Sequence, residues 1–409
     1  MAELYSLPNG WEWKKLDDFV SIKGGKRIPK GKKLLETKTN YPYIRVTDFN
    51  DFGSIDLNNI QYITEDIYNE IKNYIISKDD IYISIAGTIG KTGIVPNELD
   101  GANLTENAAK FVFDNSKYDK FFLLYFTNSI PFLEQIGLAT KTVAMPKLAL
   151  TRLKEVEIPL PPFEEQKRIV AKLDILFEKI DKAIALHQKN IDEADIFMAS
   201  VLNDVFVELE EKYGKQLLLD GVYIGCKKGF KPTIINGKVP FIGMSDIDEH
   251  NGINTKYVME DYGNVSNGKT KFEKNAVLVG KITPCTQNNK TTIVPSNIDG
   301  GFATTEVYAL HSMSNMNPYY LNHFMRSKEV NEFLVSTMVG ATGRQRVPSE
   351  SIKNLQISIP PLKTQQKVVS YLDEISNKME KIKNLQKKKM QSLKELKASI
   401  LDKAFKGEL

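Results

Sequence analysis

The chain has 409 residues, of which 42% are hydrophobic and 26% charged, which is ordinary for a globular protein and allows two or three domains. The net charge of +4 permits nucleic-acid binding without demanding it, so any basic surface has to be local. Cys226 and Cys285 are the two cysteines and have no CxxC spacing, which argues against a disulfide framework or a zinc site. The sequence shows neither an apolar signal core nor a run long enough to span a membrane, so we expect a cytoplasmic protein without a membrane partner.

Residues 1–157 are predicted to form a mixed α/β domain. Short β-rich runs occur at 43–46, 81–85 and 110–113 between loops rich in Gly, Asn and Lys, and the apolar spacing over 118–136 predicts a helix. The stretch from Ile85 to Thr92 reads IAGTIGKT and resembles a phosphate-binding loop, but the leading glycine of that motif is missing. We therefore interpret it as a strand followed by a Gly-rich loop.

Residues 158–208 predict a long helix. Pro161-Pro162 fits its start, because proline lacks an amide donor and is accommodated in the first turn. Apolar residues then recur at spacings of three and four along the whole segment, which is typical of a coiled-coil seam. The run Leu160 to Phe163 also resembles the catalytic motif of amino-methyltransferases, but Leu160 offers no polar acceptor for an amine.

Residues 209–356 repeat the order of the first domain. The run at 240–246 matches that at 42–48, the run at 293–295 matches 94–96, and 319–335 matches the predicted helix of the first domain. The loops between these runs differ in length and content. We therefore predict a duplicated scaffold with individual loops, and loops on a rigid scaffold are where recognition usually lies.

Residues 357–409 predict a second long helix. Residues 357–373 read ISIPPLKTQQKVVSYLD, and they align without a gap, at an offset of 199 residues, with residues 158–174, which read IPLPPFEEQKRIVAKLD. An offset of about half the chain indicates a duplicated two-part protein rather than a short-period solenoid.

The fold class that follows is α/β, with two mixed α/β domains separated by two long helices. The apolar seams of the helices need partners, and each helix is the nearest partner of the other. Since the chain runs domain, helix, domain, helix, the two helices are predicted to pack as an antiparallel coiled coil that relates the halves by a pseudo-two-fold axis.

No catalytic centre is predicted. The four histidines, His187, His250, His311 and His323, have no metal-ligand spacing, and the carboxylates form no recognisable nuclease or hydrolase arrangement. We therefore predict a chain that is not itself an enzyme.

Basic and amide-rich loops remain as candidates for DNA binding, because Arg and Lys read guanine edges or grip phosphates and Asn and Gln read adenine. The strongest is the run from Gly343 to Arg346, where two guanidiniums flank an amide. The candidates in the first domain are Lys23, Lys26, Arg27, Lys30, Arg45, Lys91, Thr92, Lys141 and Lys147. The candidates in the second domain are Lys227, Lys228, Lys281, Gln287, Asn288, Asn289, Lys290, Arg344, Gln345 and Arg346.

The whole chain resembles the specificity subunit of type I restriction-modification systems. The resemblance rests on residues 7–11 (LPNGW), on both Pro-Pro…Gln…Leu-Asp helix starts, and on residues 405–409 (FKGEL). It implies that 1–157 and 209–356 are target recognition domains, each reading one half of a split, asymmetric sequence in double-stranded DNA. It also implies that 158–208 and 357–409 are the family's conserved helices, which space the domains.

The resemblance further implies partners and cofactors. Two methyltransferase subunits, which carry S-adenosylmethionine, are expected to dock on the helices, and restriction subunits that use ATP and magnesium join the complex, while this chain holds no cofactor or metal. The candidate docking residues are Pro161, Pro162, Gln166, Pro360, Pro361 and Gln365. Lys363-Thr364 stands at the second helix start where the first has Glu164-Glu165, so the two docking sites are expected to be unequal.

Two other interpretations stay open on the sequence. A nuclease or methyltransferase with a degenerate site in one domain predicts turnover by the pure chain with metal or S-adenosylmethionine. A coiled-coil adaptor that binds only protein predicts weak, salt-insensitive DNA association, whereas phosphate contacts make affinity fall steeply with salt.

Overall fold

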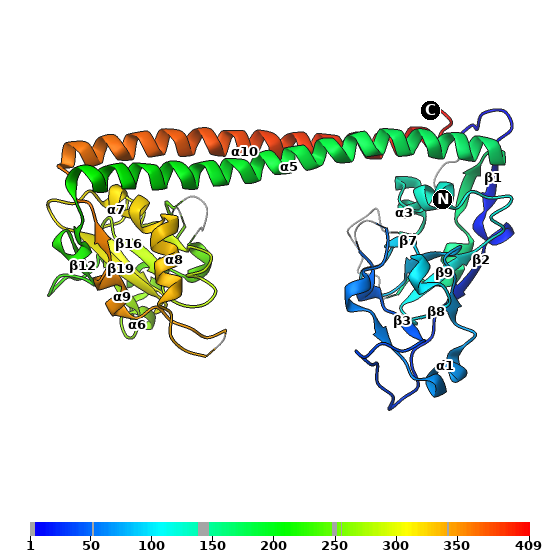
Figure 1. Cartoon of the computed structure of the whole chain (residues 1–409), viewed down its shortest axis with the longest axis horizontal. Helices are drawn as coiled ribbons and strands as arrows, with labels where there is room; N and C mark the ends of the chain where they lie inside the picture. The colour runs from blue at the N-terminus through cyan, green and yellow to red at the C-terminus, as the bar shows by residue number, and fades with distance from the viewer. Residues whose placement is uncertain (1–4, 51–52, 138–146, 248–251, 255, 342) are drawn as a thin grey trace. The chain divides into compact units, whose positions relative to one another are not determined.

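The computed structural model describes residues 5–50, 53–137, 147–247, 252–254, 256–341 and 343–409. The chain forms two compact units (Figure 1). Unit 1 consists of Met1–His187 and Lys388–Leu409, and unit 2 consists of Gln188–Lys387. Each unit therefore contains a portion of both long helices together with one α/β domain.

The two long helices are α5 (Phe163–Tyr213) and α10 (Leu362–Phe405). Both begin later than the ranges 158–208 and 357–409 predict, because the residues before each double proline pair as short strands. The first helix also runs on to Tyr213, and Gly214 follows it with a φ of 73°. Glycine adopts this left-handed conformation without steric cost, so it is the usual residue after a helix end.

The long helices run antiparallel within each unit. In unit 1 the start of α5 lies beside the end of α10, where Lys397 forms an ion pair with Asp181 at 2.8 Å. In unit 2 the end of α5 lies beside the start of α10, where Lys383 forms an ion pair with Asp195 at 2.9 Å. The predicted antiparallel packing of the two helices is confirmed in both units.

Unit 1 contains two four-stranded sheets, in the orders β2-β9-β6-β7 and β4-β3-β8-β5, and a two-stranded sheet β1-β10. Its strands are β1 (Glu12–Lys15), β2 (Ser21–Gly24), β3 (Pro42–Ile44), β4 (Gln61–Tyr62), β5 (Ile75–Ile76), β6 (Ile81–Ser84), β7 (Thr92–Ile94), β8 (Ala102–Leu104), β9 (Ala108–Val112) and β10 (Glu157–Leu160). Its shorter helices are α1 (Glu65–Ile71), α2 (Lys120–Thr127), α3 (Ile130–Gln135) and α4 (Leu150–Lys154).

Unit 2 repeats this topology, with the sheets β12-β19-β16-β17, β14-β13-β18-β15 and β11-β20. Its strands are β11 (Gln216–Leu217), β12 (Val222–Ile224), β13 (Lys238–Ile242), β14 (Val258–Asp261), β15 (Thr270–Glu273), β16 (Val277–Gly280), β17 (Thr291–Ile293), β18 (Gly300–Ala303), β19 (Val307–Ser312) and β20 (Gln356–Ile357). Its shorter helices are α6 (Tyr262–Val265), α7 (Pro318–Met325), α8 (Lys328–Ser336) and α9 (Ser349–Lys353). The predicted α/β scaffold is therefore present twice.

The single helix predicted over 118–136 is two helices, α2 and α3. The first ends at Thr127, with Asn128 as its C-cap. Ser129 caps the second, because its side chain accepts a hydrogen bond from the Phe132 amide. Pro131 then occupies the first turn of α3, where its missing amide costs nothing. In unit 2, Ser327 separates α7 from α8 in the same way.

The largest core of each unit joins one four-stranded sheet to the two-helix portion. In unit 1, Phe111 of β9 and Phe122 of α2 belong to the same buried cluster as Leu173 of α5 and Phe405 of α10. In unit 2, the equivalent cluster joins residues of β16, α7, α5 and α10. Since one face of each of these sheets is covered by helices, the loops at the strand ends are left to make external contacts.

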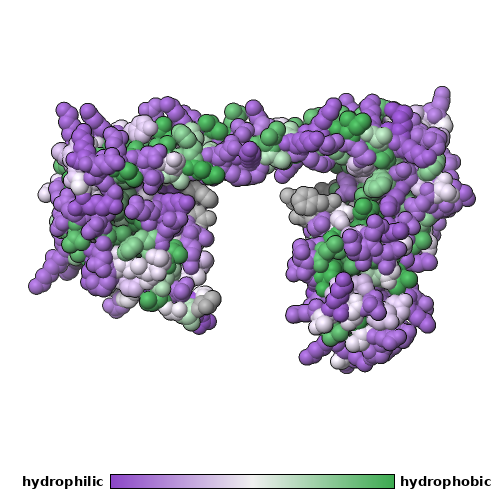
Figure 2. Space-filling view, viewed as in Figure 1, coloured by the Kyte–Doolittle hydropathy of each residue, from purple (hydrophilic) through white to green (hydrophobic). Residues whose placement is uncertain are grey.

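Hydrophobic side chains also lie exposed along the long helices, where Figure 2 shows green residues between purple ones. They include Leu186 and Leu396 in unit 1, and Ile196 and Leu385 in unit 2. Among the helices that the structure describes, none has an apolar stretch of the length that crossing a bilayer requires.

Candidate nucleic-acid interface

Strand ends bring the candidate loops of unit 1 to one edge of the sheet β2-β9-β6-β7. The end of β6 lies opposite the start of β9, since Ser84 pairs with Ala108. The end of β2 reaches the same place, because Gly24 pairs with Ala109, and β7 starts there because it runs antiparallel to β6. We call this the loop edge of the sheet.

Basic residues from two separate segments meet at the loop edge of unit 1, around Glu106. The Arg27 guanidinium forms an ion pair with the Glu106 carboxylate at 2.5 Å, and the Lys147 ammonium donates to the Glu106 carbonyl at 3.2 Å. Lys26 lies beside them, since its amide donates to the carbonyl of Leu104. Lys23 and Lys30 are exposed on β2 and on the loop that follows it.

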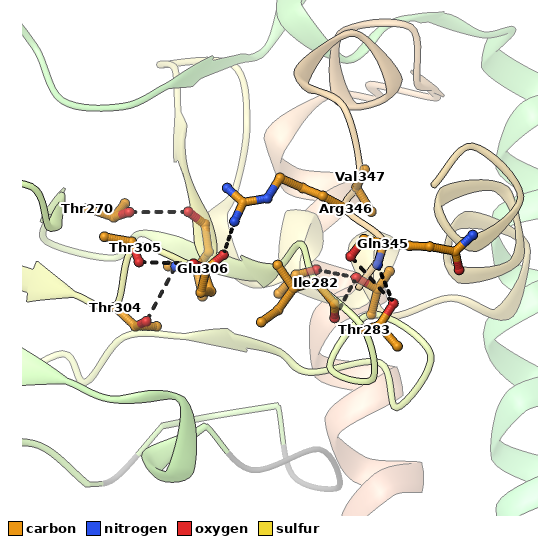
Figure 3. Close-up of polar contacts among 12 residues, drawn as sticks. Thr270, Ile282, Thr283, Thr304, Thr305, Glu306, Gln345, Arg346 and Val347 are labelled. Carbon is orange, nitrogen blue, oxygen red and sulfur yellow. Dashed lines mark hydrogen bonds and ion pairs between the residues drawn. The ribbon is translucent and has the colours of Figure 1, made fainter. Parts of the chain in front are cut away.

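The same edge of unit 2 carries a second basic cluster, at the end of β16 and the start of β19. Arg346 forms an ion pair with Glu306 at 2.7 Å (Figure 3). Lys281 follows β16 directly, and its ammonium lies 4.8 Å from the centre of the Tyr308 ring. Two backbone hydrogen bonds join the three segments, from Lys281 to Glu306 and from Val347 to Lys281.

The backbone positions of the two clusters correspond. In unit 1 the amide of Leu148 donates to the carbonyl of Ile85 at 2.7 Å, and in unit 2 the amide of Val347 donates to the carbonyl of Lys281 at 2.8 Å. Lys147 and Arg346 stand directly before these two donors. A basic side chain therefore occupies the same scaffold position in both units.

Burial and like charge act together on Lys281. Burial lowers the pKa of the Lys281 ammonium, the neighbouring Arg346 lowers this pKa further, and Glu306 opposes both effects. The scaffold thus holds two cations close together with one carboxylate. Such an arrangement favours an anion such as a phosphate group, because the anion relieves the repulsion between the cations.

Three predicted DNA-binding residues instead have structural roles. The Arg45 guanidinium donates to the Asp48 carboxylate, to Gln61 and to the Asn59 carbonyl. The Thr92 hydroxyl is buried and accepts hydrogen bonds from Thr127 and Asn128. The Asn289 side chain donates to the Arg326 carbonyl. Internal partners therefore give these polar groups a structural role, and contact between these three residues and DNA stays a prediction.

The remaining candidates are spread more widely. Gln287 and Asn288 are exposed in the connection between β16 and β17, and Lys290, in the same connection, is partly buried. Lys91 is partly buried in the corresponding connection of unit 1, between β6 and β7. Lys227 and Lys228 do not join the cluster of unit 2. The Lys227 amide donates to the Glu273 carboxylate, and Glu273 pairs with Gly300 at the start of β18, whereas Glu306 of the cluster follows the end of that strand. Lys141 lies outside the described residues.

Glu106 and Glu306 are the residues of this interface that the sequence did not indicate. Each lies in the short turn before β9 or β19 and holds an arginine from a different part of the chain. The only sequence signal is the similar pair of runs Thr105-Glu106 and Thr305-Glu306. This signal does not reveal the arginine that each carboxylate contacts.

The predicted docking glutamines are buried inside their own units. Gln166 and Gln365 are 1% and 0% exposed. Each side chain accepts a hydrogen bond from a helix-capping residue, Asp119 or Asn317, and donates one to the carbonyl of the first proline of the pair. The prediction that these glutamines contact a partner is therefore wrong. Pro161 and Pro360 are also buried, whereas Pro162 and Pro361 are exposed.

Two further repeated contacts hold the long helices on the domains. Tyr125 of α2 donates to Asp174 of α5, and His323 of α7 contacts Asp373 of α10 at 2.9 Å. These two carboxylates stand at equivalent positions of the repeat. They are part of the packing between helix and domain in each unit.

The comparisons with known proteins agree with this duplicated scaffold. The sequence matches the family described as type I restriction modification DNA specificity domain over residues 8–194 and 226–390. A type I restriction enzyme specificity subunit of Methanocaldococcus jannaschii, MjaVIII, is 27% identical over 207 residues, which are 49% of this chain and 47% of that protein. This alignment thus spans about half of the relative.

Other similarities extend over the whole chain. The putative type I restriction enzyme MjaX specificity subunit of the same organism is 22% identical and covers 100% of this chain and 96% of its own length. A chain of a solved structure, described as the basis of complex assembly and conformational transition of the type I R-M system, has a TM-score of 0.74. It is 19% identical and covers 99% of this chain and 100% of its own, so it shows the same fold.

The duplicated α/β scaffold with a loop edge in each copy is thus that of a DNA-specificity protein. The chain belongs to the type I restriction modification DNA specificity domain family.

Proposed function

We propose that this chain is the DNA-recognition subunit of a type I restriction-modification complex, and that each unit reads one half of a split, asymmetric sequence in double-stranded DNA. The observation that carries the proposal is the pair of loop edges. Both present basic side chains at equivalent scaffold positions, Lys147 and Arg346, while the surrounding loops differ in length and residue type. A common scaffold with different contact residues suits two different half-sites.

Partners are proposed to bind along the long helices, where methyltransferase subunits would dock and restriction subunits would join them. Each unit leaves apolar side chains exposed on its long helices, Leu186 and Leu396 in unit 1 and Ile196 and Leu385 in unit 2, and a partner subunit would cover them. The docking surface proposed from the sequence is thereby moved from the buried glutamines to the exposed faces of α5 and α10. S-adenosylmethionine, ATP and magnesium would be bound by those partners, in the cytoplasm.

The proposal assigns no catalytic step to the chain. Methylation and cleavage would be carried out by the partner subunits, and this chain would select the sequence on which they act. A pure chain that turned over DNA with metal or S-adenosylmethionine would favour the enzyme interpretation instead.

Base-resolution methylation mapping tests the proposal. We would compare cells that carry the chain and its methyltransferase partner with cells that lack only the chain. A split motif that disappears on deletion is expected, and exchange of residues 209–356 for those of a relative should change one half of the motif. Identical maps in both strains would contradict the proposal and favour the protein-only adaptor.

A further inference from the structure

Unit 2 carries a hairpin-like loop that extends its loop edge, and one antiparallel bridge, between Val339 and Arg346, joins its two arms. We call this loop the ribbon. Val339 and Arg346 exchange both backbone hydrogen bonds, from Val339 to Arg346 at 3.0 Å and from Arg346 to Val339 at 2.9 Å. The arms of the ribbon are residues 339–341 and 343–347, and the Arg344 amide donates to the Ala341 carbonyl at 2.9 Å. In Figure 1 this segment, drawn in orange between α8 and α9, extends away from the rest of unit 2.

The base of the ribbon is fixed to the sheet. Ile282 pairs with Arg346 as an antiparallel bridge, and the Thr283 amide donates to the Gln345 carbonyl at 3.1 Å. The Thr283 hydroxyl lies within hydrogen-bonding distance of the Gln345 backbone (Figure 3). Val347 is buried and bonds to Lys281. The ribbon is therefore positioned by the scaffold.

The two arginines of the ribbon differ in their surroundings. Arg346, at the base, forms its ion pair with Glu306 and lies close enough to Lys281 to lower the pKa of that ammonium. Arg344, nearer the tip, is exposed, and within the described part of the chain its guanidinium has neither an ion pair nor a side-chain hydrogen bond. The N–H donors of the Arg344 guanidinium are thus available to a ligand.

A ribbon of this kind matches the major groove of B-DNA. Two paired strands lie about 4.8 Å apart, and the groove, roughly 12 Å wide, admits a two-stranded β-ribbon. An arginine there donates two hydrogen bonds to the O6 and N7 atoms of guanine, and apolar side chains contact the thymine methyl group. Val339, which is 61% exposed on the other arm, offers such an apolar contact.

We infer that the ribbon of unit 2 enters the major groove of the DNA half-site that this unit reads, and that Arg344 specifies a guanine there. Arg346 and Lys281 contact backbone phosphates at the base of the ribbon, and Glu306 positions Arg346. This inference rests on the proposed function, because it names the base contact that one unit makes.

A selection from random-sequence duplex DNA tests the inference. The full-length chain, produced together with its methyltransferase subunits, would be compared with the variants Arg344→Lys, Arg344→Gln and Arg346→Gln. Lys238→Gln is the matched control, since Lys238 is exposed at the start of β13, away from the loop edge. The motif that each protein selects and the salt dependence of its affinity would both be measured.

The two Arg344 variants separate base reading from charge. Lysine keeps the positive charge but not the planar pair of donors, so Arg344→Lys should retain the salt dependence and lose the preference for guanine. We expect this loss to be on the order of tenfold at one position, with the other half of the motif unchanged. Arg346→Gln should instead weaken binding to all sequences and reduce the salt slope by about one.

Several outcomes would overturn the inference. An unchanged motif in both Arg344 variants would show that Arg344 reads no base. A uniform loss of affinity in Arg344→Gln, with the motif of Arg344→Lys unaltered, would show a phosphate contact. Since Arg344 is exposed and Arg344→Lys conserves its length and charge, folding should be unaffected, and circular dichroism would check this. If the wild-type complex selected no motif at all, the proposed function itself would fail.

Discussion

Gln166 joins the start of α5 to the cap of α2, since its side-chain oxygen accepts a hydrogen bond from the backbone amide of Asp119 at 2.8 Å. Gln365 makes the equivalent bond with Asn317 at 2.7 Å in unit 2. In each unit the capping residue in turn accepts hydrogen bonds from the first amides of its helix. The Pro-Pro…Gln pattern, which occurs at both helix starts, therefore fixes each long helix on its own domain.

Replacing either glutamine with alanine should destabilise its unit. Gln166→Ala leaves a buried amide and the Pro161 carbonyl without their partners, which costs about 1–3 kcal/mol for each unsatisfied group. Both tryptophans, Trp11 and Trp13, belong to unit 1, so urea unfolding followed by tryptophan fluorescence measures this unit. The exposed neighbour Glu164→Gln is the control. Equal unfolding midpoints for both variants would contradict the structural role.

Phe405, the last residue of α10, should contribute as much to the stability of unit 1 as any core residue. Phe405 is fully buried and packs edge-on against Phe122 and Phe126 at 5.1 and 5.3 Å between ring centres. Phe405→Ala should lower the free energy of unfolding of unit 1 by about 3–5 kcal/mol. The same tryptophan signal measures it, and the exposed Leu396→Ala, on the same helix, serves as the comparison.

Phe206 has the matching role in unit 2, where it contacts Tyr320 and Phe324 at 5.3 and 5.4 Å. Phe206→Ala should therefore accelerate hydrogen exchange in the core strands of unit 2 and leave the fluorescence transition of unit 1 in place. A shift of the fluorescence transition as large as that of Phe405→Ala would show that the packing is not local to one unit.

Arg45 should affect stability rather than DNA specificity. Its guanidinium is the ion-pair partner of Asp48, whose side chain is 1% exposed, and a buried carboxylate without its partner is costly. Arg45→Ala should destabilise unit 1 by about 1–3 kcal/mol, whereas the exposed Lys26→Ala should leave stability unchanged. A selection from random duplexes would then show an unaltered motif for Arg45→Lys, and a changed motif would restore Arg45 as a base contact.

Unit 2 should lose stability on mild acidification because of His311. Burial lowers the pKa of the His311 imidazole below its ordinary value of 6.5, with Glu273 opposing this shift and Lys227 adding to it. Below pH 6.5 the unfolded chain therefore binds a proton that the folded unit does not bind. The stability of unit 2 is complete above pH 6.5 and falls as the pH drops toward the lower pKa of the folded state.

Hydrogen exchange of the core amides of unit 2 between pH 7.5 and 5, corrected for the intrinsic exchange rates, measures this effect. His311→Gln, which has no titrating group, should remove most of the pH dependence of stability, although it loses the acceptor of the Glu273 amide bond. An identical pH dependence in both proteins would assign the effect to other groups.

Much of the fold could be predicted because local sequence patterns indicate it. The offset of the repeat, the double prolines and the apolar spacing indicated two domains and two long helices, and the two equal sheet orders confirm that duplication. The predicted start of the first long helix was less accurate. Pro159 lies in β10 and Pro161 directly follows it, and α5 begins only at Phe163. Strand pairing over 140 residues, as between β1 and β10, has no local signal.

The candidate interface was predicted in residue type and only partly in position. Arg27, Lys147, Lys281 and Arg346 do meet at the loop edges, because antiparallel strands bring their ends together. Arg45, Thr92 and Asn289 are instead hydrogen-bonded to other parts of the fold, which the sequence did not indicate. Spacing along a chain reports which residues are polar and does not report which of them are already hydrogen-bonded.

The sequence by itself determined the family, the duplication and the antiparallel order of the helices, since these follow from patterns that repeat along the chain. Only the tertiary structure decided which side chains face outward. Gln166 accepts a hydrogen bond from Asp119, 47 positions away, and Arg346 is ion-paired with Glu306, 40 positions away. Arg344, two residues from Arg346, is exposed. Which side chains face outward, and which partners hold the others, depends on contacts between segments that are distant in the sequence.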